Sequence, residues 1–230
     1  MTTDSTVGQK IDLFTSDNEE LSVQLNNQNL TDQDMKTVVK HAIEKRQCTL
    51  LDLQDNKITS EGMSILVSAL NNNTKLRALY LNGNPLSNKG IYELIQVLAS
   101  DNKTLEILGL NSTGLSDVGA EDLSAMLQQN QALKCLQLKS NQIDTRGVLH
   151  LTETLAKKNT TLEQLDLADN RLITDSSVDY VVDMIKTNQS LKVLDLSNCS
   201  ISDAGKAKLQ QAMKSNKDLQ LILEIVNLDL

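Results

Sequence analysis

A pattern of apolar and polar positions eleven residues long recurs along the chain. Its clearest copy is LEQLDLADNRL, residues 162–172, with leucine at the first, fourth, sixth and last places and asparagine at the ninth. The fourth and sixth places flank one residue, which is the alternation of a β-strand with one buried face. Copies begin near residues 20, 48, 76, 105, 133, 162 and 191. We therefore expect seven short strands at nearly constant spacing.

A second apolar pattern, between these copies, predicts helices. In most repeats two apolar residues follow the last apolar residue of the copy by eight and twelve places, as Leu94 and Leu98 follow Leu86. A step of four residues places both side chains on one face of a helix. Serine or threonine stands where a helix N-cap is needed, at Ser87, Ser116, Thr174 and Ser202.

Asparagine and glycine mark the two ends of each expected helix. Each helix should stop at an asparagine, with the left-handed backbone that this residue tolerates. These asparagines are Asn73, Asn102, Asn130, Asn159, Asn188 and Asn216. A glycine recurs in the first turn, where we expect neighbouring helices to crowd: Gly62, Gly90, Gly119, Gly147 and Gly205.

Strand, turn, helix and loop thus repeat with a period of 28 or 29 residues. This arrangement resembles the ribonuclease-inhibitor class of leucine-rich repeats, which NOD-like receptors and the GTPase activator for Ran also contain. The resemblance covers residues 20–230 and implies an α/β solenoid, a horseshoe segment with a concave parallel β-sheet and convex α-helices. It also implies a ladder of turn asparagines, Asn56, Asn84, Asn141 and Asn170, with departures at Gln28, Thr113 and Cys199.

One repeat is irregular. The repeat that begins at Leu162 has an extra residue before its helix, which we assign to Ile173. We expect a local bulge at Ile173 and a helix that is shifted relative to its neighbours. Leu172 should then take the interior place at the end of the strand copy.

The two ends of the chain lie outside the regular period. Residues 1–19 are either a cap, in which Ile11, Leu13 and Phe14 pack over the first repeat, or a disordered leader. Residues 20–218 hold the seven repeats, and residues 219–230 are expected to form a last strand. The open edge of such a strand favours weak self-association. The alternative is that the natural chain continues further.

The acidic composition narrows the choice of partner. A net charge of −8 and a pI near 4.8 repel phosphate, so nucleic acid and anionic membranes are poor partners and a basic protein surface is a better one. The first residues lack the basic start and apolar stretch of a signal peptide. We expect a cytoplasmic protein, or one in the host cytoplasm after secretion without a signal peptide if it is a bacterial effector.

The sequence predicts no catalytic residue, no metal ligand and no cofactor. His41 and His150 have no cysteine or second histidine at ligand spacing. The three cysteines are far apart, fit neither a zinc site nor a disulfide framework, and are expected to be reduced thiols. Seven Asn-x-Ser/Thr triplets occur, and the asparagines of the repeat explain them better than glycosylation does.

Strand alternation defines a predicted binding surface on the concave face. One column reads Ser22, Leu50, Ala78, Ile107, Cys135, Gln164 and Val193, and the next reads Gln24, Asp52, Tyr80, Gly109, Gln137, Asp166 and Asp195. Apolar anchors are expected at Leu50, Tyr80 and Ile107, with a hollow at Gly109. The acidic flanks are Asp52 and Asp55 on one side and Asp166, Asp169 and Asp195 on the other.

These positions favour a protein-binding module without enzymatic activity, whose partner carries an apolar knob between basic patches. The alternative for the positions themselves is that they are solvated strand residues. The resemblance to NOD-like receptors implies a cytosolic sensor or adaptor, and a eukaryote-like bacterial effector is the other setting. A function of a different class is a GTPase activator resembling that of Ran, for which Arg171 is the nearest candidate for a catalytic-type arginine.

Overall fold

The computed structural model describes residues 7–8, 11, 21–71, 73–100 and 102–224. The chain forms two compact units, Met1–Gly114 and Leu115–Leu230. The boundary falls inside the repeat that begins at Leu105, after the strand of that repeat and before its helix. Each unit therefore contains its own strands and its own layer of helices.

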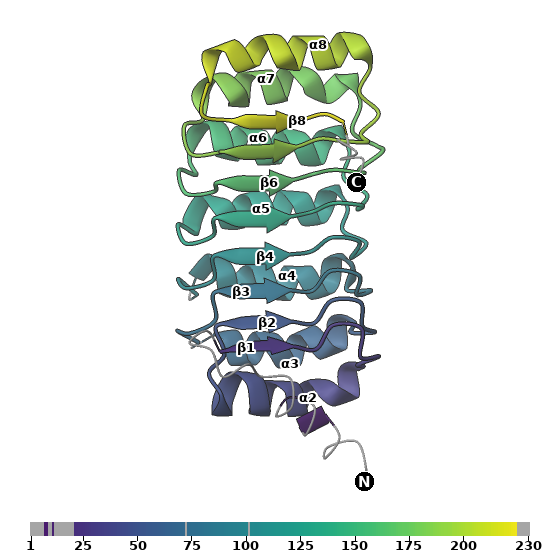
Figure 1. Ribbon diagram of the computed structural model, residues 1–230, viewed down its shortest axis with the longest axis vertical. Coiled ribbons are helices and arrows are strands. Elements are labelled where there is room, and N and C mark those ends of the chain that lie inside the picture. The colour runs from purple at the N-terminus through teal and green to yellow at the C-terminus, as the bar shows by residue number, and fades with distance from the viewer. Residues whose placement is uncertain (1–6, 9–10, 12–20, 72, 101, 225–230) are drawn as a thin grey trace, which may run out of the picture. The chain divides into compact units, whose positions relative to one another are not determined.

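The first unit is a parallel sheet with helices on one side (Figure 1). Its strands are β1 (Ser22–Gln24), β2 (Leu50–Asp52), β3 (Ala78–Tyr80) and β4 (Ile107–Gly109). Its helical elements are the 3-10 turn η1 (Asp32–Asp34), α2 (Met35–Val38), the π-helical segment η2 (Val39–Lys45), α3 (Ser60–Leu70) and α4 (Ser87–Ser100). The strands pair in chain order, so each repeat adds one strand beside the preceding one.

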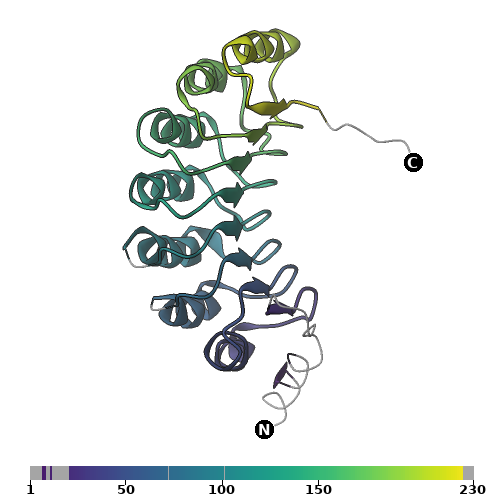
Figure 2. The ribbon, with the colours of Figure 1, turned by 60° about the vertical axis from the view of Figure 1, so that its left-hand side comes forward.

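The second unit repeats this arrangement, with its strands in one layer and its helices in the other (Figure 2). Its strands are β5 (Cys135–Gln137), β6 (Gln164–Asp166), β7 (Val193–Asp195) and β8 (Gln220–Ile222). Its helices are α5 (Asp117–Gln129), α6 (Thr145–Lys157), α7 (Val178–Thr187) and α8 (Asp203–Ala212), with the 3-10 turns η3 (Asp175–Ser177) and η4 (Met213–Ser215). Each of the strands β1 to β7 begins two residues after a repeat start predicted from the sequence.

The core of each unit is aliphatic, as the scarcity of aromatic residues requires. The middle residue of each strand from β1 to β7 is buried: Val23, Leu51, Leu79, Leu108, Leu136, Leu165 and Leu194. The predicted helix residues, such as Leu94 and Leu98, are buried opposite them. Burying each of these side chains stabilises the fold by roughly 1.5–3 kcal/mol.

The turn asparagines form the predicted ladder. Asn84 is fully buried, and its Nδ2 donates to the carbonyl oxygens of Leu53 and Leu81 at 2.8 and 3.0 Å. Its Oδ1 accepts a hydrogen bond from the Ile58 N–H at 3.1 Å, so one amide joins two repeats. Asn56, Asn141 and Asn170 make the same kind of hydrogen bonds to backbone groups. Where another residue replaces asparagine, the side chains of Thr113 and Cys199 each donate to one carbonyl oxygen.

A second asparagine ladder lies where the helices end. Our prediction of a left-handed backbone there is wrong, because Asn130 and Asn188 have φ angles of −80° and −75°. The side chain matters instead. Asn159 Oδ1 accepts the Leu162 N–H at 2.9 Å, and Asn159 Nδ2 donates to the Leu127 carbonyl oxygen of the preceding repeat at 2.9 Å. Three asparagines of Asn-x-Ser/Thr triplets are buried in this way, as the repeat explanation predicts: Asn102, Asn159 and Asn188.

The irregular repeat places its extra residue in the turn before η3 and α7. Ile173 occupies the interior place and is fully buried, whereas Leu172 is 56% exposed, so our interior assignment of Leu172 is wrong. The predicted helix shift is also wrong. Val181 and Ile185 lie eight and twelve residues after Ile173 and are buried, as in the other repeats. The turn at Arg171 and Leu172, not the helix, therefore absorbs the extra residue.

The starts of the helices are crowded, as the recurring glycines predict. An added Cβ at Gly62 would lie 3.0 Å from Met35 Cγ of the neighbouring helical element, and one at Gly147 would lie 3.1 Å from Ala120 Cβ. Three predicted residues occupy N-cap positions: Ser116 before α5, Thr174 before η3 and Ser202 before α8. At the last of these the Ser202 hydroxyl accepts the Gly205 N–H at 3.2 Å. Ser87 is not the residue before α4 but its first residue, with a φ of 57°.

Aspartates connect the starts of successive helices. Asp175 accepts hydrogen bonds from the backbone N–H and the hydroxyl of Ser202, at 2.8 and 2.6 Å, and these bonds hold the pKa of Asp175 below its ordinary value. Asp117 accepts the N–H of Asp144 at 2.7 Å in the same way. Here two carboxyl groups meet, so burial and the Asp144 side chain together raise the pKa of Asp117.

The described residues at the two ends bear on the cap and on the last strand. Val7 and Ile11 are buried, and an added Cβ at Gly8 would lie 3.0 Å from His41 Cε1 of η2. A cap over the first repeat stays a prediction, since Val7, Gly8 and Ile11 are the described residues among 1–19. Leu13 and Phe14, the other predicted cap residues, lie outside the described residues, as do residues 225–230 of the last segment.

Candidate interaction surfaces

Strand pairing aligns the predicted surface residues of the first unit into two columns. Leu50 stands beside Ala78, which stands beside Ile107, and Asp52, Tyr80 and Gly109 form the second column. Leu50, Tyr80 and Ile107 are half-buried, which leaves part of each side chain open on the sheet face. Ala78 and Gly109 are buried, so these two predicted contact residues present little surface of their own to a partner.

The hollow predicted at Gly109 is filled. An added Cβ there would lie 2.9 Å from Tyr80 Cδ1 and 2.8 Å from Asn82 Oδ1. The missing side chain therefore makes room for two neighbours of the adjacent repeat and leaves no pocket for a ligand. The Tyr80 ring therefore lies beside Gly109 of β4.

A chain of hydrogen bonds crosses the rim of the first unit where the strands end. Gln54 Nε2 donates to Asp52 Oδ2 at 3.0 Å, and Asn82 Nδ2 donates to Gln54 Oε1 at 2.7 Å. Asn82 Oδ1 in turn accepts the backbone N–H of Asn111 at 2.7 Å. Asp55 is exposed next to this rim, with a φ of 53°. These bonds fix the polar groups of the rim before any partner arrives.

The second unit aligns its columns in the same way, and its face is more polar. Cys135, Gln164 and Val193 form one column, which Gln220 of β8 continues. The other column contains Gln137, Asp166 and Asp195, which Ile222 of β8 continues. Gln164 is exposed and the other predicted members are half-buried. Sequence reasoning missed Gln220 and Ile222 because the last copy of the repeat is irregular.

The carboxylates of the second unit have a structural role as well as a charge. One oxygen of Asp166 accepts the Ala168 N–H at 2.9 Å, and one oxygen of Asp195 accepts the Ser197 N–H at 2.8 Å. Each aspartate thus holds the turn that follows its own strand. Burial raises the pKa of Asp166, and the neighbouring carboxylates of Asp195 and Asp169 add to this increase.

Asp169 differs from Asp166 in its surroundings. Its Oδ1 accepts a hydrogen bond from Asn198 Nδ2 at 3.0 Å, and its Oδ2 lies 3.3 Å from the Lys139 ammonium nitrogen. These contacts lower the pKa of Asp169.

Burial raises the pKa of the Cys135 thiol, and it raises the pKa of the Cys199 thiol to about 12. Both thiols are therefore protonated and weak nucleophiles at neutral pH.

Among the described residues, no group of three or more His, Cys, Asp or Glu side chains is placed to hold a metal ion. His150 Nε2 lies 3.9 Å from a carboxylate oxygen of Glu121 on the neighbouring helix. Arg171 is exposed in the turn before η3, and its carbonyl oxygen accepts the Ser200 hydroxyl at 2.7 Å. In the part of the chain that is described, no helix is long and apolar enough to span a bilayer.

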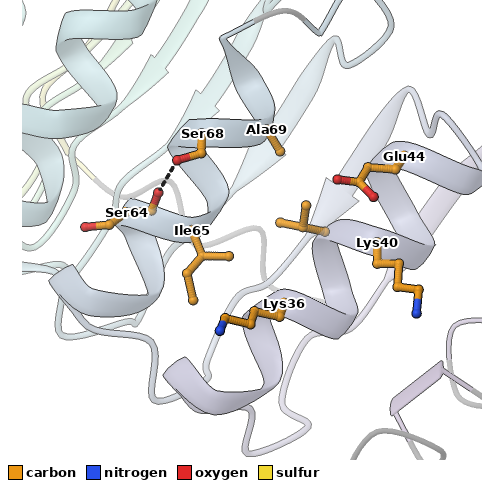
Figure 3. Close-up of a pocket in the computed structure, with 8 residues that line it drawn as sticks. Lys36, Lys40, Glu44, Ser64, Ile65, Ser68 and Ala69 are labelled. Carbon is orange, nitrogen blue, oxygen red and sulfur yellow. Dashed lines mark hydrogen bonds between the residues drawn. The ribbon is translucent and has the colours of Figure 1, made fainter.

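The helical side of the first unit carries an open groove of about 570 Å³ between α2–η2 and α3 (Figure 3). Val39 and Ile65 provide apolar surface within it. Lys36 and Lys40 stand on one wall, and the Glu44 carboxylate on the same wall is turned toward α3. The groove therefore combines both signs of charge and favours no single class of ligand.

Comparisons with known proteins agree with this architecture. The family described as "Leucine Rich repeat" matches more than half of the chain, at residues 49–67, 72–94, 101–124, 129–151, 158–181 and 187–209. A segment of 114 residues is 36% identical to "NACHT, LRR and PYD domains-containing protein 3" of Macaca mulatta, covering 49% of this chain and 11% of that protein. Ribonuclease inhibitor of Sus scrofa is 34% identical over 106 residues, which is 46% of this chain and 23% of the inhibitor.

Among solved structures, the tropomodulin C-terminal domain of Caenorhabditis elegans superimposes with a TM-score of 0.53. That match covers 67% of this chain and 93% of the tropomodulin domain at 20% identity, so it supports the fold alone. The sequence matches to the two curated relatives cover only a small part of each relative's length. The repeated strands, helices and asparagines coincide with the matched segments, and this chain belongs to the leucine-rich repeat family, in the class shared by ribonuclease inhibitor and the NACHT, LRR and PYD domains-containing proteins.

Proposed function

We propose that this chain is a protein-binding module without enzymatic activity, and that each unit binds through the sheet face opposite its helices. One observation supports this proposal most strongly. The core position of each strand from β1 to β7 is leucine or valine, whereas the aligned sheet-face positions differ from repeat to repeat. The fold requires an apolar residue at each core position but leaves the sheet-face positions free to vary. The sheet face is therefore where a partner can be recognised.

The two sheet faces favour different parts of a partner. In the first unit, Leu50, Tyr80 and Ile107 offer apolar contacts, and a tyrosine against a fixed backbone is a typical anchor. In the second unit, Asp166 and Asp195 stand on adjacent strands and favour a basic surface. The partner should therefore be a protein with both apolar and basic surface, and not nucleic acid or a membrane, since an acidic protein repels polyanions.

The setting is also part of the proposal. The similarity to NACHT, LRR and PYD domains-containing proteins supports a cytoplasmic sensor or adaptor, or a fragment of one. A eukaryote-like bacterial effector that acts in the host cytoplasm is the other setting. A NACHT domain beside these repeats in the full gene would favour the first, and a bacterial source would favour the second.

The test measures binding of the partner recovered by affinity capture with the full chain. Tyr80→Ala should speed dissociation, because an anchor is lost. The double substitution Asp166→Ala with Asp195→Ala should slow association and flatten its salt dependence, because steering is lost. A matched control is Glu61→Ala with Glu153→Ala, which removes two charges from the exposed helical side. Association and dissociation rates that neither sheet-face variant changes would contradict the proposal.

The last strand carries a second proposal. β8 ends the sheet of the second unit in the described chain, and Leu221 and Ile222 are only half-buried. We expect weak self-association through this edge. Leu221→Lys should abolish any concentration-dependent increase in mass in light scattering. The idea would be refuted if light scattering showed that the unmodified chain is a monomer at millimolar concentration.

A further inference from the structure

A second groove lies on the helical side of the second unit, between α7 and the segment α8–η4, and has a volume of about 500 Å³. Val182 of α7 and Ala212 of α8 are both buried and provide its apolar floor. Three lysines stand around it: Lys186, Lys208 and Lys214. No carboxylate is among the residues that line it. The groove is therefore positive in a chain whose net charge is −8.

The positive charge of this groove is only partly neutralised. Lys208 of α8 forms an ion pair with Asp179 of α7, and this pair connects the two helices. Lys186 and Lys214 are exposed, and neither forms an ion pair with any residue that the structure describes. Other lysines of this unit do have carboxylate partners within 4 Å, for example Lys192 with Glu163 and Lys206 with Glu224. Two unpaired ammonium groups thus flank an apolar floor.

We propose that this groove binds an acidic segment of a partner protein. The carboxylates of the segment would lie against Lys186 and Lys214, and an apolar side chain between them would contact Val182 and Ala212. Both interactions are needed for useful affinity, because exposed ion pairs alone contribute little. The occupant is thus an amphipathic segment with aspartate or glutamate on either side of an aliphatic residue.

Extended polyanions fit this groove less well than a short acidic segment does. A nucleic acid or an anionic membrane reaches far beyond two lysines, and it would meet two exposed acidic groups of α7, Asp179 and Asp183. The groove of the first unit offers a contrast, because Glu44 places a negative charge between its walls (Figure 3). The uniform sign of charge distinguishes the groove of the second unit.

This inference goes beyond the proposed sheet-face function, since it concerns the opposite side of the second unit. The sheet face of that unit carries Asp166 and Asp195, and its helical side carries Lys186 and Lys214. The unit can therefore hold a basic partner on one side and an acidic segment on the other at the same time. Substitutions on one side should leave the other side unaffected.

The experiment selects displayed random peptides of about twelve residues against the full chain and measures the affinity of the selected peptides by fluorescence anisotropy. The test variant is Lys186→Glu with Lys214→Glu. The matched control is Lys75→Glu with Lys89→Glu, which changes the net charge by the same amount at exposed sites of the first unit. Circular dichroism verifies that both variants are folded. Vesicles of phosphatidylserine and single-stranded oligothymidylate serve as the competing probes.

We expect selection to enrich peptides that carry acidic residues around an aliphatic one. These peptides should bind the test variant roughly tenfold more weakly than the unmodified chain, and should bind the control variant with little change. Selection without acidic enrichment would overturn the proposal, as would acidic peptides that bind both variants equally. The proposal would also be overturned if no peptide bound and the unmodified chain bound vesicles or oligothymidylate instead. If the test variant alone lost that binding, the groove would be assigned to that ligand.

Discussion

Replacing Asn84 by alanine should remove one rung of the turn ladder in the first unit. Asn84 is fully buried, and the substitution deprives three backbone groups of their partner: the carbonyl oxygens of Leu53 and Leu81 and the N–H of Ile58. A buried group without a partner costs about 1–3 kcal/mol, and carbonyl oxygens that keep another hydrogen bond lie at the lower end. We therefore expect a loss of about 3–5 kcal/mol in the free energy of unfolding.

A graded series separates this effect from a general loss of packing. Asn84→Thr should destabilise less than Asn84→Ala, because the hydroxyl of Thr113, at the equivalent place in the next repeat, donates to the Leu110 carbonyl oxygen at 2.8 Å. Asn71→Ala is the control, since Asn71 is exposed at the end of α3, and it should change stability by less than about 0.5 kcal/mol.

Urea unfolding followed by far-UV circular dichroism measures the three variants, and hydrogen exchange locates the change. Exchange should accelerate first at the N–H of Ile58, which loses its acceptor. Repeat proteins often unfold in parts, so the local exchange rate is a necessary second measurement. Equal stability of Asn84→Ala and Asn71→Ala, with unchanged exchange at Ile58, would refute the ladder as a source of stability.

Three further substitutions test other parts of the fold. Leu110→Ala removes a fully buried side chain and should cost about 2–5 kcal/mol in urea unfolding. Asp144→Ser should lower the pKa of Asp117, measured by carboxyl-carbon NMR, because the second carboxyl group is replaced by a hydroxyl donor. Asp166→Asn keeps an acceptor for the following turn and removes the repulsion from Asp195, so it should raise stability by roughly 0.2–1 kcal/mol at neutral pH. Since the folded-state pKa of Asp166 is raised, its ionisation costs stability as pH rises above the ordinary value of 3.8, and the advantage of asparagine should vanish below that pH.

The parts of the fold that follow from periodicity could be predicted from the sequence. Core leucines such as Leu165 and the turn asparagine Asn170 recur at fixed spacing, and the structure buries both. The backbone conformation at Asn130 could not be predicted. The general preference of asparagine for a left-handed backbone at helix ends does not take into account the hydrogen bonds that its side chain makes here. Whether Leu172 or Ile173 takes the interior place depends on the length of one turn. Because the two residues are adjacent and both apolar, the sequence does not determine that length.

The candidate surfaces were predicted only in part. Register alone placed Asp166 beside Asp195 correctly. It could not show that Tyr80 fills the space above Gly109, since that depends on the size of a neighbouring side chain. The groove beside Lys186 was not predicted either, because it arises where small and buried residues of two different helices face each other. Such features need the packing of neighbouring repeats, which no single repeat encodes.

Site-specific photo-crosslinking from both sides of each unit tests the proposed sheet-face binding most directly. A benzophenone side chain replaces Leu50 or Gln164 on the sheet faces, and Ser68 or Lys157 on the helical sides, in the full chain mixed with the partner that affinity capture recovers. The account predicts that one partner protein is captured from the sheet-face positions and is not captured from the helical positions. Capture of that same partner from the helical positions alone would contradict it.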